Sequence, residues 1–302
     1  MSTRSRVLEV QLRKGASAEE RHGRRRVSVV HISDTHGKHW ELLDAGMIPE
    51  GDILVHSGDF MNRKTAVLEE MTATLEDMNA FFGALPHKHK VFVAGNHEYC
   101  MFDYGSHAAD EDGQPSGEER DGKRRTPTLA TVVDKYKSAE EIQAVLPNCV
   151  YLQDQEVELE GLRFYGTPWN ATSSAFALGK AGRRAVYKKI PAGIDVLVTH
   201  TPMYGILDTA WVSWPILYAV MQRSLWSGCC RVCKEPWHHQ YGHAGCHVLK
   251  EEVLNRVEPK VSLFGHVHDH HGAAQVGSTL CVNSALANNN AAHVVDLFLD
   301  SD

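Results

Sequence analysis

The sequence predicts an α/β protein built on two mixed β-sheets. Short β-branched apolar runs recur along the chain, and each is about the length of a buried strand. Some of these runs are separated by helical patterns, and other segments alternate around glycine-containing turns. Runs that are apolar on both faces indicate a sheet covered by helices, whereas alternating segments indicate hairpins. The combination predicts parallel strand units mixed with hairpins.

Five apolar runs are the predicted parallel strands. They span 27–33, 52–57, 90–94, 195–199 and 260–264. Between the second and third runs, residues 65–83 carry apolar side chains at helical spacing, and Gly83 can end that helix. The order strand, helix, strand is the order of a parallel unit.

Further helices and hairpins follow from local patterns. Residues 138–141 read Ser-Ala-Glu-Glu, a capping box that predicts a helix, and 249–257 carries an apolar helical stripe. Residues 156–166 and 273–284 alternate around glycine turns and predict hairpins. Residues 293–299 predict a closing strand.

Length, charge and cysteine content narrow the class of protein. A chain of 302 residues is long enough for one large α/β domain or two small ones. The net charge of -7 shows no basic field, so nucleic-acid binding is not expected. Seven scattered cysteines without a signal peptide predict a reducing, cytoplasmic location. No apolar stretch is long enough to span a membrane.

Three segments depart from the strand and helix patterns. Residues 1–26 are Arg-rich without an apolar core and predict a flexible basic tail. Residues 105–126 are polar and charged and predict a disordered loop insert. Residues 210–247 form an insert rich in Trp, Cys and His. The tail and the inserts leave 27–302 as the folded domain.

Metal-binding side chains follow all five predicted strands. The nineteen histidines already direct attention to metal sites, because imidazole is the commonest metal ligand. The residues that follow the runs are, in chain order, Asp34 and His36, Asp59, Asn96 and His97, His200, and His266 and His268. Open α/β sheets gather ligands at the carboxyl ends of their strands. Oxygen and nitrogen donors suit Mn, Fe or Zn, and this set is about right for two ions.

Spacing supports a shared site. Asp34 and His36 are two residues apart, and so are His266 and His268. In an extended segment the members of each pair project to one face. Glycines precede Asp59, Asn96 and His266 and allow sharp turns there. Each residue alone could be a helix cap or a turn residue, but the ordered set favours a two-metal site.

The motifs "DTH", "GD", "GNHE", "H" and "GHVH" resemble the signature of the calcineurin-like metallophosphoesterase superfamily. The segments "HISDTHGK", "VAGNHEY" and "YLQDQEVELEGLRFYGTPW" are most similar to its metallophosphoesterase-domain-containing (MPPED, 239FB-like) metallophosphodiesterase subgroup. The resemblance implies a four-layer α/β/β/α sandwich with two mixed sheets. It also implies a calcineurin-like phosphoesterase domain over 27–302.

The resemblance also implies roles for the residues. Asp34, His36 and His268 would bind one divalent ion, Asn96, His200 and His266 a second, and Asp59 both. The ions would be Mn²⁺, Fe²⁺ or Fe³⁺, or Zn²⁺. Asn96 and His97 would contact the substrate phosphate, with His97 as the catalytic residue. Independently of the resemblance, Glu98 is expected either to orient a neighbouring imidazole or to be a simple surface carboxylate.

The predicted activity is hydrolysis of a small phosphodiester, with cyclic nucleotides as the class that the subgroup indicates. A hydroxide bridging the two ions would attack phosphorus in line. One alternative is a phosphomonoesterase or protein phosphatase on the same site. Another is a scaffold protein with weak activity that acts through the 210–247 insert. Nothing in the sequence indicates an oligomeric state.

The 210–247 insert contains a second candidate metal site. Cys230, Cys233, His238 and His243 have the spacing C-x2-C-x4-H-x4-H, which resembles a small zinc site. A zinc knuckle here would be the basis of a nucleic-acid-binding alternative. In the other interpretation, the insert packs its tryptophans, Trp211, Trp214 and Trp226, on the domain or on a partner.

The remaining histidines are expected at core, surface or cleft-rim positions. His31 and His56 lie inside strand runs and are predicted to be core residues. A surface position is expected for His39, His87, His89 and His107. Residues 269–271 follow the last metal motif, and we expect them at the rim of the cleft without an assigned role.

Overall fold

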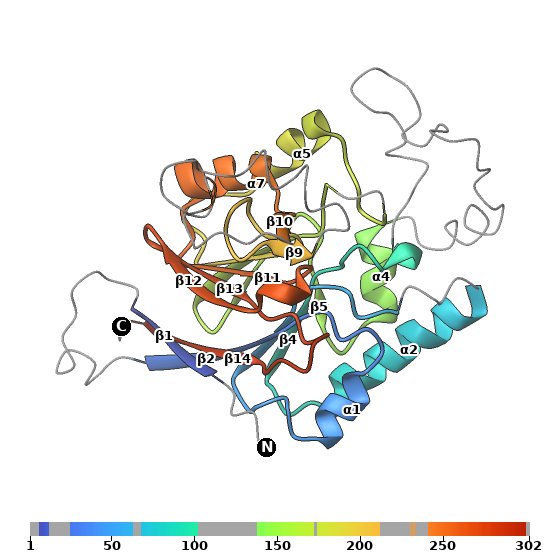
Figure 1. Ribbon diagram of the computed structural model, residues 1–302. Helices are drawn as coiled ribbons and strands as arrows, with labels where there is room; N and C mark the ends of the chain where they lie inside the picture. The colour runs from blue at the N-terminus through green and yellow to red at the C-terminus, as the bar shows by residue number, and fades with distance from the viewer. Residues whose placement is uncertain are drawn as a thin grey trace, which may run out of the picture.

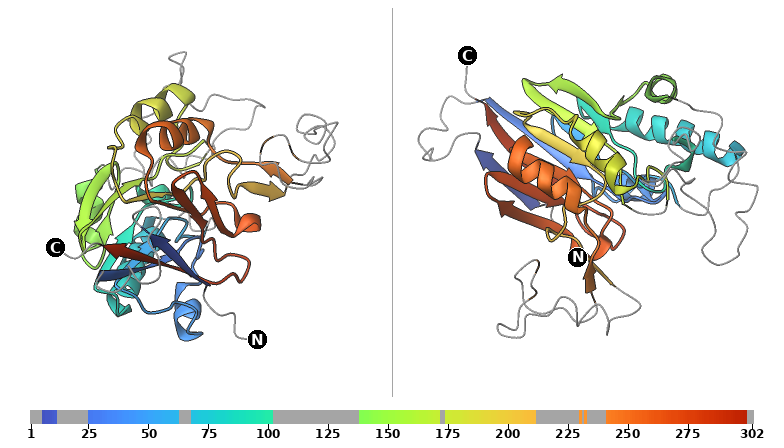
Figure 2. Two further views of the ribbon diagram at one scale, coloured as in Figure 1. Left: turned by 90° about the vertical axis from the view of Figure 1, so that its left-hand side faces the viewer. Right: turned by 90° about the horizontal axis from the view of Figure 1, so that it is seen from above.

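The computed structural model describes residues 6–11, 25–62, 68–101, 138–171, 174–211, 230, 232 and 241–299. Two six-stranded mixed sheets lie face to face, with helices on their outer faces (Figures 1 and 2). This is the four-layer α/β/β/α arrangement that was predicted.

The first sheet holds the three N-terminal parallel strands. Its order is β1 (Arg6–Gln11), β14 (His293–Leu299), β2 (Arg25–Ile32), β3 (Ile53–His56), β4 (His89–Phe92) and β5 (Val150–Tyr151). β2, β3 and β4 run parallel, and β14 runs antiparallel to β2. The outer face carries α1 (His39–Asp44) and α2 (Leu68–Ala84), which connects β3 to β4 as the sequence predicted (Figure 1).

The second sheet holds the remaining parallel strands and both predicted hairpins. Its order is β12 (Gly272–Val276), β13 (Thr279–Asn283), β11 (Val261–Phe264), β8 (Val196–Thr199), β7 (Leu162–Thr167) and β6 (Gln155–Leu159). The pairs β6–β7 and β12–β13 are antiparallel, whereas β7, β8, β11 and β13 are mutually parallel. On its outer face lie α5 (Lys180–Tyr187) and α7 (His247–Glu252), which continues into the π-helical turn η3 (Val253–Val257).

Five short elements complete the described chain. α4 (Ala139–Val145) begins at Ser138, whose side chain accepts a hydrogen bond from the Glu141 amide, as the capping box predicts. The 3₁₀ turns are η2 (Tyr99–Met101) and η4 (His268–His270). β9 (Thr209–Trp211) and β10 (Tyr241–His243) form a small antiparallel pair beside η4 (Figure 2).

The core between the two sheets explains why the five runs are apolar on both faces. Val29 and Val55 of the first sheet pack with Phe164 and Val198 of the second in one fully buried cluster. The next residue along a strand, such as Val30, belongs instead to the cluster that contains the helices' side chains. Each strand therefore needs apolar side chains at successive positions.

Part of the segment 1–26, which was predicted to be a flexible tail, forms β-strands in the structure. Residues 6–11 form β1, which pairs parallel with β14, and Arg25 and Arg26 already belong to β2. Without β1, β14 would be an edge strand with unpaired backbone groups. The rest of 1–24 and the 105–126 loop lie outside the described residues. Among the helices that are described, none is long and apolar enough to cross a membrane.

Truncation of Phe164, which is fully buried between the sheets, is expected to destabilise the protein strongly. Phe164→Ala should lower the free energy of unfolding by about 3–5 kcal/mol, because it removes the ring and leaves a cavity. Equilibrium unfolding in urea measures this change. Lys188→Ala, at an exposed position, is the control and should change the value by less than about 0.5 kcal/mol. Equal effects of the two changes would contradict the described packing.

Candidate metal centre

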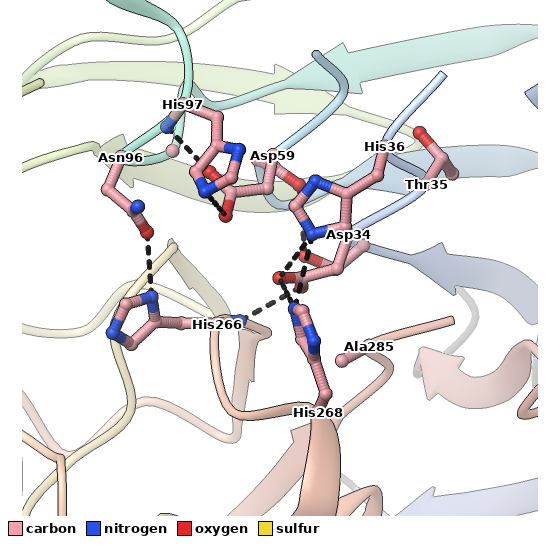
Figure 3. Close-up of polar contacts among 12 residues, drawn as sticks. Asp34, Thr35, His36, Asp59, Asn96, His97, His266, His268 and Ala285 are labelled. Atoms are coloured by element: carbon pink, nitrogen blue, oxygen red, sulfur yellow. Dashed lines mark hydrogen bonds and ion pairs between the residues drawn. The ribbon is translucent and has the colours of Figure 1, made fainter. Parts of the chain in front are cut away.

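The five ligand-bearing loops meet at one end of the sheets (Figure 3). They follow β2, β3 and β4 in the first sheet and β8 and β11 in the second, so the carboxyl ends of the parallel strands converge. Backbone contacts join the loops to one another. The Gly265 amide donates to the His200 carbonyl at 3.0 Å, and the His266 amide donates to the Asp34 carboxylate at 2.9 Å. The second contact joins the two sheets directly.

One group of ligand atoms comes from Asp34, His36 and His268. The His268 Nε2 lies 3.1 Å from the Asp34 Oδ1 and 3.2 Å from the His36 Nε2. Asp34 is fully buried, whereas the His268 side chain is 35% exposed. One carboxylate oxygen and two imidazole nitrogens therefore converge at a point that is open on one side.

A second group comes from Asn96, His200 and His266. The Asn96 Oδ1 lies 2.9 Å from the His200 Nε2. It also lies 2.7 Å from the His266 Nδ1 (Figure 3). The two imidazole nitrogens are 3.2 Å apart. His266 and His268, although two residues apart, thus belong to different groups.

Asp59 lies between the two groups. Its Oδ1 is 3.4 Å from the His200 Nε2, and one of its carboxylate oxygens lies within 4.8 Å of ring nitrogens of His36 and His97. The His97 amide donates to Oδ1 at 2.9 Å, and the His97 Nε2 lies 3.8 Å from Oδ2. The structure brings all seven residues predicted as ligands, together with His97, into one cluster.

Left-handed backbone conformations make this convergence possible. The φ angles are 55° at Asp34, 45° at His36, 56° at Asp59 and 67° at His266. Such angles are uncommon outside glycine, cost on the order of 1–3 kcal/mol each, and cluster at functional sites. The expectation of extended segments at the two-residue spacings is therefore wrong. The paired ligands converge because the chain turns at them, not because of the strand pleat.

The three glycines that precede ligands act in two ways. Gly58 has a φ of 103°, so it provides the sharp turn that was predicted. Gly95 and Gly265 instead allow close approach. A Cβ on Gly95 would meet the Asp59 backbone nitrogen at 2.5 Å, and one on Gly265 would overlap the Asp34 carboxylate.

Glu98 holds the loop that carries Asp59. Its fully buried carboxylate accepts hydrogen bonds from the amides of Asp59 at 2.9 Å, Met61 at 3.0 Å, and Gly95. Burial, with the nearby charge of Asp59, raises the pKa of Glu98 to about 7. The prediction that Glu98 orients an imidazole is wrong, because its partners are backbone amides.

Backbone carbonyls orient two of the imidazoles. The Nδ1 of His36 lies 3.1 Å from the Met61 carbonyl, and the Nδ1 of His200 lies 2.9 Å from the Ser57 carbonyl. Donation from Nδ1 leaves the Nε2 lone pair directed at the ligand group. Sequence reasoning missed these partners because every residue has a carbonyl, so no residue type marks them.

The protonation states in the cluster decide which side chains can bind a cation directly. Burial would raise the pKa of Asp59, but the imidazoles of His200 and His97 outweigh it and hold that pKa well below its usual range. Burial opposes the charge on His200, yet the Asp59 carboxylate raises the His200 pKa to about 9. Burial and the neighbouring His200 lower the pKa of His266 to about 4. An ionised carboxylate and a neutral imidazole are forms that bind metal.

His31 and His56 are core residues, as predicted. The His31 ring lies between the Ser57 Oγ at 2.9 Å and the Ser284 Oγ at 2.7 Å. His56 lies 3.1 Å from the Thr35 Oγ1. Both imidazoles are fully buried behind the ligand loops.

The surface positions expected for His39 and His87 are wrong. The two residues are 3% and 2% exposed. The His39 Nε2 lies 2.7 Å from an Asp77 carboxylate oxygen on α2, and the His87 Nε2 lies 3.0 Å from the Pro49 carbonyl. A polar ring can be buried where it has such a partner, and the sequence does not show the partner. His89 is half-buried against Glu160, and His107 lies outside the described residues.

Residues 269 and 270 form hydrogen bonds with β9, a role that the sequence did not reveal. The Thr209 hydroxyl lies 2.8 Å from the His270 Nδ1, and the Trp211 amide donates to the Asp269 carboxylate at 3.0 Å.

Of the predicted zinc motif in the insert, Cys230 and His243 are described, whereas Cys233 and His238 lie outside the described residues, as do Trp214 and Trp226.

The donor set, the strand-end placement and the fold together define a metal-dependent phosphoesterase. The sequence matches the calcineurin-like phosphoesterase family over residues 27–270. The chain therefore belongs to the calcineurin-like phosphoesterase family, and it is a hydrolase of phosphoric esters.

Relatives cover most of the chain. A UPF0046 protein from Caenorhabditis elegans is 34% identical over 273 residues, which is 90% of this chain and 79% of the relative. The metallophosphoesterase domain-containing protein 1 of Homo sapiens is 31% identical over 264 residues, which is 86% of this chain and 66% of the relative. The chain thus spans slightly less than two thirds of the human relative.

Solved structures show more distant likenesses. A dimetal phosphatase from Danio rerio has a TM-score of 0.40 at 12% identity, with coverage of 91% of this chain and 99% of that one. An archaeal phosphodiesterase has a TM-score of 0.35 at 12% identity, with coverage of 88% and 92%. Likenesses this distant say nothing about the activity of this chain.

Addition of one methyl group at Gly95 is expected to displace the Asp59 loop. Gly95→Ala should remove metal from the second group, because the new Cβ cannot fit beside the Asp59 backbone. Metal analysis of the purified variant measures this loss. Gly179→Ala is the matched control, since its Cβ would meet nothing within 4 Å. Full metal content in Gly95→Ala would contradict the described approach.

Metal binding to the second group is expected to strengthen as the pH rises. His200 has a pKa of about 9 in the metal-free protein, so it carries a proton at neutral pH that an incoming ion must displace. The apparent affinity for Mn²⁺ should rise about tenfold per pH unit up to about pH 9, since one proton is released. Competition titrations at two pH values measure the slope. A flat profile would show that His200 binds no metal.

Proposed function

We propose that this protein is a dinuclear metal-dependent phosphodiesterase that acts on small phosphodiesters, with cyclic nucleotides as the first class to test. One observation carries the proposal: two groups of ligand atoms lie side by side and Asp59 lies between them. A carboxylate has two oxygens and can serve two cations at once. The donors are carboxylate, amide and imidazole, which suit Mn²⁺, Fe²⁺ or Fe³⁺, or Zn²⁺.

Each group would hold one ion. Asp34, His36 and His268 would hold the first, Asn96, His200 and His266 the second, and Asp59 would contact both. Two bound divalent cations would lower the pKa of a water nucleophile and neutralise charge on the phosphoryl oxygens. Asn96 would also contact the substrate phosphate, because its side chain lies beside the His97 loop.

His97 is the proposed catalytic residue. Its side chain is 16% exposed, and its ring lies against that of His36, with centroids 4.7 Å apart. It can therefore face a substrate held at the metal groups. An imidazole there can donate a proton or a hydrogen bond to the leaving oxygen. The hydrogen bond between its amide and Asp59 holds the backbone from which the ring extends.

Charge balance favours a diester over a monoester. The carboxylates among the ligands of the two groups are those of Asp34 and Asp59. Two divalent cations and two carboxylates leave two positive charges. A phosphodiester monoanion and one hydroxide nucleophile would balance them, whereas a monoester dianion would leave an uncompensated negative charge in a buried site.

The test compares a diester with a monoester. Mn²⁺-loaded protein should hydrolyse bis-p-nitrophenyl phosphate faster than p-nitrophenyl phosphate, and cyclic nucleotides extend the panel. His97→Ala should lower kcat for the diester by about 10²–10⁴-fold at unchanged metal content, because it removes a proton donor and no ligand. His89→Ala, a half-buried histidine paired with Glu160, is the control and should keep full activity.

Preference for the monoester would overturn the substrate assignment and favour a phosphomonoesterase. Absence of turnover on every phosphoester, with His97→Ala indistinguishable from the unaltered protein, would overturn the proposed activity.

A further inference from the structure

A second cluster of metal-binding side chains lies beside β9 and β10. It consists of Cys230 from the insert, His243 at the end of β10, and Asp208 directly before β9. The Cys230 Sγ lies 3.3 Å from the His243 Nε2, and the His243 Nδ1 lies 2.6 Å from the Asp208 Oδ1. The three residues are 1%, 5% and 0% exposed. None of them belongs to the two ligand groups described above.

Asp208 fixes the imidazole of His243. Its second oxygen accepts hydrogen bonds from the amides of Gly205 at 2.9 Å and Gly245 at 3.0 Å, so the carboxylate cannot rotate freely. A carboxylate accepts from the imidazole, which places the proton on Nδ1. The Nε2 then presents its lone pair toward Cys230. A histidine that ligates a metal usually donates its other ring N–H to a carboxylate in this way.

Cys230 is held in a manner that suits a thiolate. The Val232 amide lies 3.4 Å from the Cys230 Sγ and donates to it. Such a donor stabilises the thiolate, which is the form that binds metals. Tetrahedral zinc with bonds of about 2.3 Å to sulfur and about 2.0 Å to nitrogen separates the two ligand atoms by about 3.5 Å. The separation of 3.3 Å between Sγ and Nε2 is close to this value.

We propose that Cys230 and His243 are ligands of a zinc ion and that Asp208 orients His243 for it. A thiolate paired with an imidazole selects zinc over the harder ions Mg²⁺ and Mn²⁺. This site is independent of the proposed phosphoesterase centre.

The position of the cluster indicates what the zinc would do. β10, which carries His243, pairs with β9, and β9 is bonded to Asp269 and His270 of η4. η4 begins at His268, a ligand of the first metal group. Zinc at Cys230 and His243 would therefore hold Cys230 against β10, in the pair of strands that supports this ligand loop.

Cobalt substitution tests the proposal, because Co²⁺ bound to a thiolate gives a sulfur-to-cobalt charge-transfer band in the near ultraviolet. The phosphoesterase centre has no sulfur ligand and gives no such band. The full-length protein loaded with Co²⁺ should show the band, and Asp59→Asn, which disables the phosphoesterase centre, should keep it. Cys230→Ser should lose it. Cys149→Ser, a buried thiol elsewhere, is the matched control and should keep it.

His243→Cys provides a rescue test. Zinc accepts a thiolate in place of an imidazole, so this variant should keep zinc and show a stronger cobalt band, whereas His243→Ala should lose both. A metal-free hydrogen bond between a thiol and an imidazole would give the opposite result for His243→Cys. Absence of the band in the unaltered protein, or an unchanged band in Cys230→Ser, would overturn the proposal. If Cys230→Ser fails to fold, the presence or absence of the band in the unaltered protein still tests the proposal.

Discussion

The buried carboxylate of Asp59, held between two sheets, is the constraint on which the rest of the site depends. An ionised carboxylate removed from water is costly unless hydrogen bonds and opposite charges compensate it. Here the His97 amide and the His200 imidazole supply that compensation in the metal-free protein. The backbone of Asp59 has a φ of 56°, and the buried Glu98 holds it there through the Asp59 amide. A bound cation would use this preformed arrangement.

The strained loops need a rigid support, which the core between the sheets provides. The fully buried Val55 and Val198 come just before the loops of Asp59 and His200. A packed interior resists displacement, so loops that leave it begin from fixed points. On the neighbouring loops after β4 and β11, His97 and His268 remain partly exposed. A rigid base for the loops and an exposed outer side are both conditions for binding a substrate at fixed metals.

Sequence reasoning located the strands and the donor side chains that cluster at their ends, but not how the chain turns at them. The five apolar runs became strands because burial on both faces leaves a continuous local pattern. The left-handed conformations at Asp34 and His266 leave no such pattern, because neither residue is glycine. Glu98 was assigned to an imidazole although it binds amides, since the partners of a buried carboxylate depend on tertiary contacts. The same reason accounts for the buried positions of His39 and His87.

By itself, the sequence determined which segments form the buried strands and which donor side chains follow them, because periodicity and residue type are local properties. Only the tertiary structure decided which donors lie together. Asp34 and His266 are 232 positions apart yet joined by a hydrogen bond of 2.9 Å. It also brought Asp208 to His243 and His243 to Cys230, where the spacing C-x2-C-x4-H-x4-H contains no aspartate. Convergence of this kind depends on how two sheets pack and where their loops turn, which no single segment encodes.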